Sequence, residues 1–201
     1  MLQMQDLFLE AKHRYSVHDL YKDPPALLFV LESPHKEELK HGVPVAGSSG
    51  RSMTKFLLNE NVPFGLRLKE HPSLLEKMGI VNVCPFPMQR SAINDEEWKQ
   101  NNSSFLEHVE KIRTSASISF KDKERAVLHN ILLQDFKERL KTAASNETTI
   151  VPCGKFAGRY VSLANKEQTY SVLEGVPHPS YNSWGRERYQ EVLMQVKKLL
   201  K

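Results

Sequence analysis

The sequence has 201 residues, of which 40% are hydrophobic and 26% are charged, and its formal net charge is +4. This composition is typical of one ordinary globular domain, which we expect to span residues 1–201. We expect neither a transmembrane helix nor a signal peptide, because no apolar run approaches ~20 residues and the N-terminus has no basic start. We therefore expect a cytoplasmic protein with no membrane partner. Only Cys84 and Cys153 carry thiols, so neither a disulfide framework nor a cysteine-bound metal is expected.

The first part of the chain alternates helical and strand patterns. Apolar residues recur at helical spacing over residues 2–18, and residues 23–25 (Asp-Pro-Pro) end that pattern. The apolar run over residues 27–31 then predicts a strand buried on both faces. A loop rich in glycine and proline follows over residues 42–50. The next segment, residues 51–59, predicts a short helix whose N-terminus faces back toward that loop, which suits a phosphate or carboxylate.

The rest of the chain continues the same alternation. The predicted elements are a strand over 79–84, helices over 95–111 and 121–144, a strand over 148–153, a helix over 155–164, a strand over 169–176 and a final helix from about residue 185. Strands that alternate with helices favour parallel pairing. We therefore predict an α/β protein, with three α/β/α layers around a central, mainly parallel four-stranded sheet.

Special residues occur where the predicted strands end. They are Glu32, Asn82, Gly154 and His178. Because open α/β sheets build their ligand crevice at the carboxyl ends of the strands, these residues are candidates for one site. Structural alternatives stay open for each polar residue. Glu32 could be a helix cap or a structural partner, Asn82 could satisfy neighbouring backbone groups, and His178 could be a turn histidine.

The order and surroundings of these residues resemble the uracil-DNA glycosylase superfamily, most closely its thermophilic iron–sulfur branch. Residues 31–38 and 42–50 fall in the register of that branch's first motif, Gly-Glu-Ala-Pro-Gly-x-x-Glu followed by Gly-x-Pro-Phe-x-Gly-x-x-Gly. Residues 81–83 are similar to its Thr-Asn-Val strand, and residues 151–157 to its third strand and Gly-x-x-Ala turn. Residues 178–180 match its His-Pro-Ser motif.

The resemblance implies a repair enzyme that hydrolyses the N-glycosidic bond of uracil, or of a related deaminated base, flipped out of DNA. Glu32 would orient the attacking water and oppose positive charge on the sugar. Asn82 would pair with the amide edge of uracil, and His178 would donate to O2 as negative charge builds on the leaving base. Glu38 matches an acidic position of the family's site.

The resemblance also implies DNA as the partner, held mainly through its phosphates. The expected phosphate-binding residues are Gly47, Ser48, Ser49, Gly50, Arg51, Arg90, Ser180 and Arg186. Tyr181 and Trp184 follow His178 where the family carries a side chain that wedges into the duplex. The alternative for Trp184 is packing under the last helix. Residues 154–201 hold eight Lys or Arg against four Glu, which fits either a phosphate-facing surface or a solvated helical face.

Three departures separate this chain from the family pattern. Val45 stands in place of the aromatic residue that stacks on the flipped base, a role that Phe86 or Phe64 could fill instead. The cysteines that bind the iron–sulfur cluster are missing, so we expect no metal and no cofactor. Ser33 and His35 replace two residues of the pocket loop.

These departures leave two hypotheses. The first is a monomeric uracil-DNA glycosylase-like hydrolase. The second is a catalytically silent member of the superfamily that binds DNA or a nucleobase in the same crevice without excision. The substitution at Val45 favours the second, whereas the retained Glu32, Asn82 and His178 favour the first.

Overall fold

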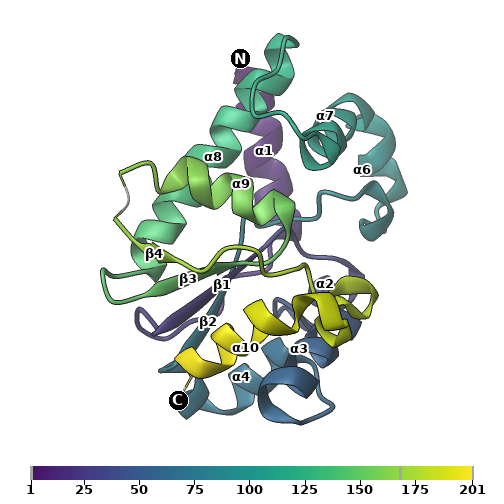
Figure 1. Ribbon diagram of the computed structural model, residues 1–201. Helices are drawn as coiled ribbons and strands as arrows, with labels where there is room; N and C mark the ends of the chain where they lie inside the picture. Colours follow the sequence, from purple (N-terminus) through teal and green to yellow (C-terminus); the bar gives the residue numbers. More distant parts are fainter. Residues whose placement is uncertain (1, 168, 201) are drawn as a thin grey trace.

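A parallel four-stranded sheet forms the centre of the computed structural model, which describes residues 2–167 and 169–200 (Figure 1). The strand order is β2-β1-β3-β4, and neighbouring strands pair in parallel. The strands are β1 (Leu27–Leu31), β2 (Met78–Asn82), β3 (Thr149–Pro152) and β4 (Ser171–Val172). The predicted α/β class with a parallel central sheet is confirmed. Of the predicted span 1–201, residues 1, 168 and 201 lie outside the described residues.

Helices cover both faces of this sheet and bury alternate side chains of each strand (Figure 1). On β1, Leu28 and Val30 pack into one core, whereas Leu27, Phe29 and Leu31 pack into the other. The first core is covered by α1 (Leu2–Tyr15), α6 (Glu96–Asn101), α7 (Ser103–Thr114), α8 (Lys123–Ala143) and α9 (Lys155–Ala164). The second is covered by α3 (Ser48–Leu58), α4 (Phe64–Glu70), α5 (Pro72–Leu75) and α10 (Gln190–Leu199).

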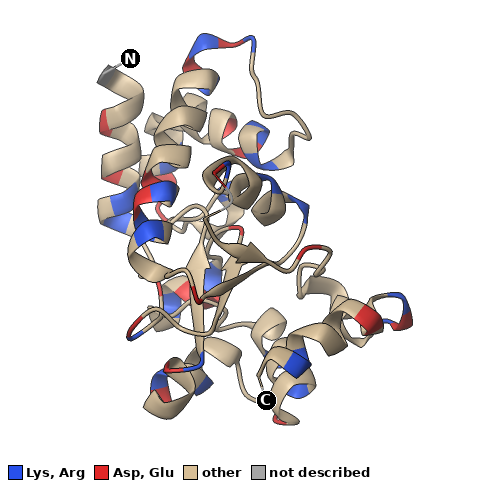
Figure 2. Cartoon of the chain, turned by 60° about the vertical axis from the view of Figure 1, so that its left-hand side comes forward, with Lys and Arg blue, Asp and Glu red and all other residues tan. Residues whose placement is uncertain are grey.

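Charged residues lie along the helices and loops, and the strands carry none (Figure 2). Because β1 is covered on both faces, its five residues are all buried.

No helix within residues 2–167 and 169–200 is long and apolar enough to cross a membrane.

Several predicted boundaries were wrong. The helix predicted over residues 95–111 is two helices, α6 and α7, because Asn102 ends the first: its Nδ2 donates to the carbonyl of Trp98 (3.0 Å). The strand predicted over 169–176 is regular only at Ser171–Val172, since Gly175 adopts a φ of 81° and bends the chain away.

The helix predictions near the site also needed correction. Helix α3 begins at Ser48 rather than residue 51, so its first turn belongs to the glycine-rich loop. The last helix, α10, begins at Gln190 rather than near residue 185. Before it, the chain forms the short 3₁₀ segments Ser180–Gly185 and Glu187–Tyr189, where Tyr181 and Asn182 have positive φ values of 54° and 52°. These left-handed residues prevent a continuous helix.

Candidate active site

A cavity of about 620 Å³ opens at the carboxyl edge of β1 and β2. Most of the predicted site residues line it, although they come from segments far apart in the sequence. They are Glu32, Ser33, His35, Glu38, Val45, Gly47, Ser48, Ser49, Asn82, His178, Ser180 and Tyr181. The parallel sheet explains this convergence, because its strands all end at the same edge.

Glu32 directly follows β1 and is held there by its backbone, whose carbonyl accepts a hydrogen bond from the Cys84 amide (2.9 Å). Its side chain is 21% exposed, and its Oε1 lies 3.6 Å from Nη1 of Arg113 on α7. Burial raises the pKa of the Glu32 carboxyl, and the positive charges of Arg113 and Arg159 oppose that rise. The site therefore holds a partly desolvated carboxylate beside a single close cation.

Asn82 is the last residue of β2, and only 2% of its surface is exposed. Its backbone is fixed by Arg139, which donates to the Asn82 carbonyl (2.8 Å), and by Asp19, which accepts from the Asn82 amide (3.4 Å). Its side-chain Nδ2, by contrast, is buried without a hydrogen-bond partner among the described residues. The alternative that this side-chain amide satisfies neighbouring backbone is therefore wrong, and its N–H groups are free to bind a ligand in the cavity.

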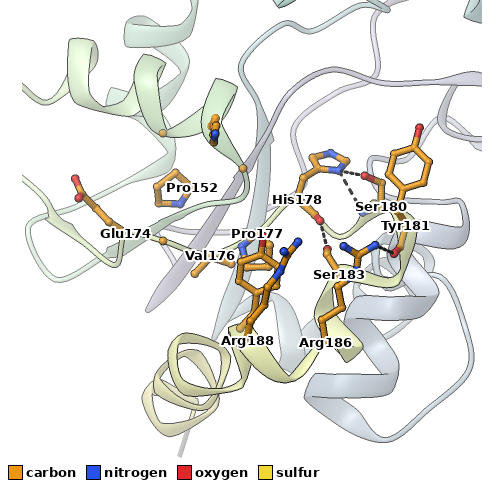
Figure 3. Close-up of a pocket in the computed structure, with 15 residues that line it drawn as sticks. Pro152, Glu174, Val176, Pro177, His178, Ser180, Tyr181, Ser183, Arg186 and Arg188 are labelled. Atoms are coloured by element: carbon orange, nitrogen blue, oxygen red, sulfur yellow. Dashed lines mark hydrogen bonds between the residues drawn. The ribbon is translucent and has the colours of Figure 1, made fainter. Parts of the chain in front are cut away.

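His178 is held in one tautomer by the turn that follows it (Figure 3). Its Nδ1 accepts a hydrogen bond from the Ser180 amide (3.2 Å) and lies 2.9 Å from the Ser180 hydroxyl. Because an accepting nitrogen carries no proton, the neutral ring carries its proton on Nε2. Burial lowers the pKa of His178, which favours this neutral form. The ring thus offers one N–H donor to the site.

Two glycines at the start of α9 should respond oppositely to alanine. Gly154 has a φ of 92°, and a Cβ there would lie 2.9 Å from the Cβ of His178, whereas a Cβ at Gly158 would meet nothing within 4 Å. We expect Gly154→Ala to lower the free energy of unfolding by about 1–3 kcal/mol. We expect Gly158→Ala, inside the helix, to raise it by about 0.5–1 kcal/mol. Thermal denaturation of both variants measures the difference, and equal effects would contradict the close packing of Gly154 on His178.

Glu38 organises the loop that closes the cavity. It lies in α2 (Lys36–His41), and its two oxygens accept hydrogen bonds from the backbone amides of His35 (2.8 Å) and Val45 (3.2 Å). Val45 is 1% exposed and has a φ of 56°, an unfavourable conformation for a β-branched residue. Glu38 therefore holds the loop in shape, with part of its hydrogen-bonding capacity already used.

Some predicted site residues lie elsewhere. Trp184 is 1% exposed, and its Nε1 donates to the carbonyl of Pro177 (2.9 Å), so its assignment as a DNA wedge was wrong and the packing alternative holds. Arg51 is exposed outside the cavity and donates to the carbonyl of Asn61 (2.9 Å). Arg90 is half-buried and also lies outside the cavity lining.

Neither ring suggested as a substitute for the stacking aromatic reaches the cavity. Phe86 is 1% exposed and Phe64 is fully buried, each in the hydrophobic core. The aromatic residue in the cavity lining is Tyr181, which is 89% exposed. Its exposure follows from its positive φ, which turns it away from the core.

Sequence reasoning missed three polar residues of the cavity, Glu37, Gln89 and Arg113. Arg113 lies at the end of α7 and Gln89 immediately before a short 3₁₀ turn at Arg90–Ala92. Arg113 follows no predicted strand and belongs to no motif, so no pattern in the sequence pointed to it. Glu37 and Gln89 lie within segments that resemble the family, residues 31–38 and 85–90, but no role was assigned to either.

A second cavity, of about 660 Å³, adjoins the first across His178, Ser180 and Tyr181 (Figure 3). Its charged lining residues are Lys155, Glu174, Arg186 and Arg188. Arg186, predicted to contact DNA, lines this cavity and donates to the carbonyl of Tyr181 (3.0 Å). Its lining thus holds three cations and one carboxylate, a balance that favours an anionic ligand.

No family model matches the sequence, and no curated protein matches it either. Within residues 2–167 and 169–200, no group of three or more His, Cys, Asp or Glu side chains could hold a metal ion. The family assignment therefore stays a prediction that depends on the motifs and the site.

Proposed function

We propose that this protein is a DNA repair glycosylase that hydrolyses the N-glycosidic bond of uracil, or of a related deaminated base, flipped out of DNA. It would act as a monomer in the cytoplasm without a cofactor. The observation that carries the proposal is that Glu32, Asn82 and His178, each at the end of a different strand or its extension, line one cavity with the Asn82 side-chain amide unpartnered.

Asn82 is suited to read the base. A flipped uracil presents an N3–H donor beside the O4 acceptor, and a side-chain amide pairs with both, through its oxygen and its N–H. Cytosine presents the reverse pattern at these positions. The buried, unpartnered Nδ2 would gain its missing hydrogen bond when uracil binds.

His178 is suited to stabilise the leaving base. Cleavage of the glycosidic bond leaves negative charge on the base, and a donor aimed at O2 stabilises that charge in the transition state. With Nδ1 occupied by Ser180, the Nε2–H of the neutral ring is the donor available. The ring would thus act by hydrogen bonding rather than as a charged acid.

Glu32 is suited to stabilise the positive charge that develops on the sugar. The sugar becomes oxocarbenium-like as the bond breaks, and a nearby carboxylate stabilises it while accepting a hydrogen bond from the attacking water. Glu32 needs its ionised form for both tasks. Glu32 lines the cavity with its Oε1 3.6 Å from Arg113 Nη1, and the sugar of the flipped nucleotide would lie beside it in that cavity.

The surroundings of the cavity suit a DNA strand. Helix α3 begins at Ser48 beside the cavity, so its first N–H groups and the Ser48 and Ser49 hydroxyls could bind a phosphate. The second cavity, with Lys155, Arg186 and Arg188, would take the phosphates of the strand beyond the flipped nucleotide. Tyr181, exposed between the two cavities, is the ring placed to fill the gap left in the duplex.

The proposal is tested by strand cleavage with alkali after incubation with labelled oligonucleotides. The substrates carry uracil, hypoxanthine, xanthine or a thymine mismatch, each in single and double strands. We expect cleavage at uracil or another deaminated base and none at thymine. No cleavage of any substrate, together with salt-sensitive DNA binding, would contradict the enzyme and support the catalytically silent binder, for which the aliphatic Val45 in the cavity is the favouring observation.

Asn82→Ala gives a prediction with two readouts. The loss of a paired contact with the base, worth about 1–3 kcal/mol, should lower uracil excision by about 10- to 100-fold. The same change removes a buried donor that has no partner, so the free energy of unfolding should stay the same or rise by about 1 kcal/mol. Single-turnover excision and urea denaturation measure the two effects, and a strongly destabilised variant would contradict the binding role.

A further inference from the structure

Arg113 has an unusual position for an arginine at the end of a helix. It belongs to the last turn of α7, yet its side chain is only 26% exposed and lines the cavity. Its one polar contact among the described residues is the 3.6 Å ion pair with Glu32, and its Nε is buried with no hydrogen-bond partner. The polar interaction of the guanidinium is therefore directed at Glu32.

Several other charged or titratable groups surround Glu32, but none of them replaces Arg113. Arg159 on α9 adds a weaker attraction from further away, since its guanidinium bonds to the carbonyl of Ser115 and lies 5.6 Å from the ring of Phe156. The remaining titratable groups are the buried thiol of Cys84 near Glu32 and, in the cavity lining, the imidazoles of His178 and His35, the carboxylates of Glu37 and Glu38, and the phenol of Tyr181.

Among the described residues, none of these remaining groups is in ion-pair contact with Glu32. Burial raises the pKa of the Cys84 thiol and lowers the pKa of His178, so both are uncharged. Glu37 and Glu38 are acidic and would repel the Glu32 carboxylate. Arg113 is thus the one cation in ion-pair contact with Glu32 within the described chain.

We propose that Arg113 is a positioning residue that keeps Glu32 ionised and oriented toward the cavity at neutral pH. The consequence for excision rests on the proposed glycosylase function, whereas the electrostatic coupling of the two side chains does not. Without the cation, the desolvated carboxylate would bind a proton more readily and lose its ability to oppose charge on the sugar. The contact of 3.6 Å leaves the carboxylate lone pairs available for a water molecule.

The direction of the pH effect follows from the active form of Glu32. Excision needs the carboxylate, so it is lost as the pH falls through the pKa of Glu32. Removing the cation raises that pKa further, and the acidic limb of the pH–rate profile moves to higher pH. At the pH where the wild type excises at half its maximal rate, Arg113→Gln should reach a smaller fraction of its own maximal rate. We expect that fraction to be about 3- to 10-fold lower than the wild-type fraction.

The experiment compares the wild type with Arg113→Gln, Arg113→Lys and Lys111→Gln in single-turnover excision over a range of pH. Arg113→Lys keeps the charge and should keep the limb near its wild-type position. Lys111 lies on the same helix but is exposed and pairs with Glu107, so Lys111→Gln should not move the limb. A limb that stays in place for Arg113→Gln, with only the plateau lowered, would overturn the proposal.

A second readout needs no excision. The ¹³C signal of the Glu32 carboxyl, identified by its loss in Glu32→Gln, is titrated by NMR in the folded wild type and in Arg113→Gln. We expect the titration to move to higher pH without Arg113, and an unchanged titration would overturn the proposal. If the wild type excises no base, the proposed glycosylase function fails, but this titration still decides the role of Arg113.

Discussion

Replacing Arg139 with methionine should lower the free energy of unfolding by about 3–5 kcal/mol. The Arg139 guanidinium on α8 pairs with the carboxylates of Asp19 (2.9 Å) and Asp135 (2.8 Å). It also donates to the carbonyls of Asn82 (2.8 Å) and Val83 (2.7 Å), where β2 ends. Methionine keeps much of the volume but removes every donor, so buried acceptors lose their partner. Urea denaturation followed by circular dichroism measures the loss.

Two further variants separate lost charge pairing from lost packing. Lys141→Met, on the same helix but exposed, should change the free energy of unfolding by less than about 0.5 kcal/mol. Asp135 keeps Lys12 as a partner, so Asp19 is the carboxylate left without a cation in Arg139→Met. Adding Asp19→Asn should therefore recover part of the lost stability. A double variant no more stable than Arg139→Met would contradict charge pairing as the cause.

The strands could be predicted because each is a buried apolar run bounded by residues that end pairing. The run over 27–31 coincides with β1, and the prediction over 148–153 contains β3. Helix α2 could not be predicted, since Lys36–His41 is short and polar and has no buried residue. It is stabilised instead by the bonds that Glu38 makes to the loop, and these depend on the folded arrangement.

Part of the candidate site could also be predicted, because some of its residues lie at the ends of the predicted strands. Residues at the ends of parallel strands, such as Glu32 and Asn82, meet at one edge of the sheet independently of the loop conformations. Arg113 reaches the same edge only because α7 packs there, and no local pattern encodes that packing. Trp184 shows the converse: its position after a motif suggested exposure, but the 3₁₀ turn places its indole beside Phe29 and Phe56 in the core.

Replacing Glu32 with glutamine should slow uracil excision by about 10²–10⁴-fold, with little change in affinity for uracil-containing DNA. Glutamine keeps the size of the side chain, but it has no negative charge to oppose the developing positive charge on the sugar. The contacts with the base would come from Asn82 and His178, which the change leaves in place. Single-turnover excision and fluorescence anisotropy with a labelled oligonucleotide measure rate and affinity separately.

Glu37→Gln is the matched control, because Glu37 lines the same cavity but is exposed, with His41 as its neighbour at 3.6 Å. We expect it to change excision by less than about twofold, as for a solvated surface charge. Only interactions that are stronger in the transition state than in the bound substrate raise the rate of the chemical step. A fall in affinity as large as the fall in rate for Glu32→Gln would therefore mean that Glu32 holds the substrate rather than the transition state. An unchanged rate would remove its carboxylate from the chemistry altogether.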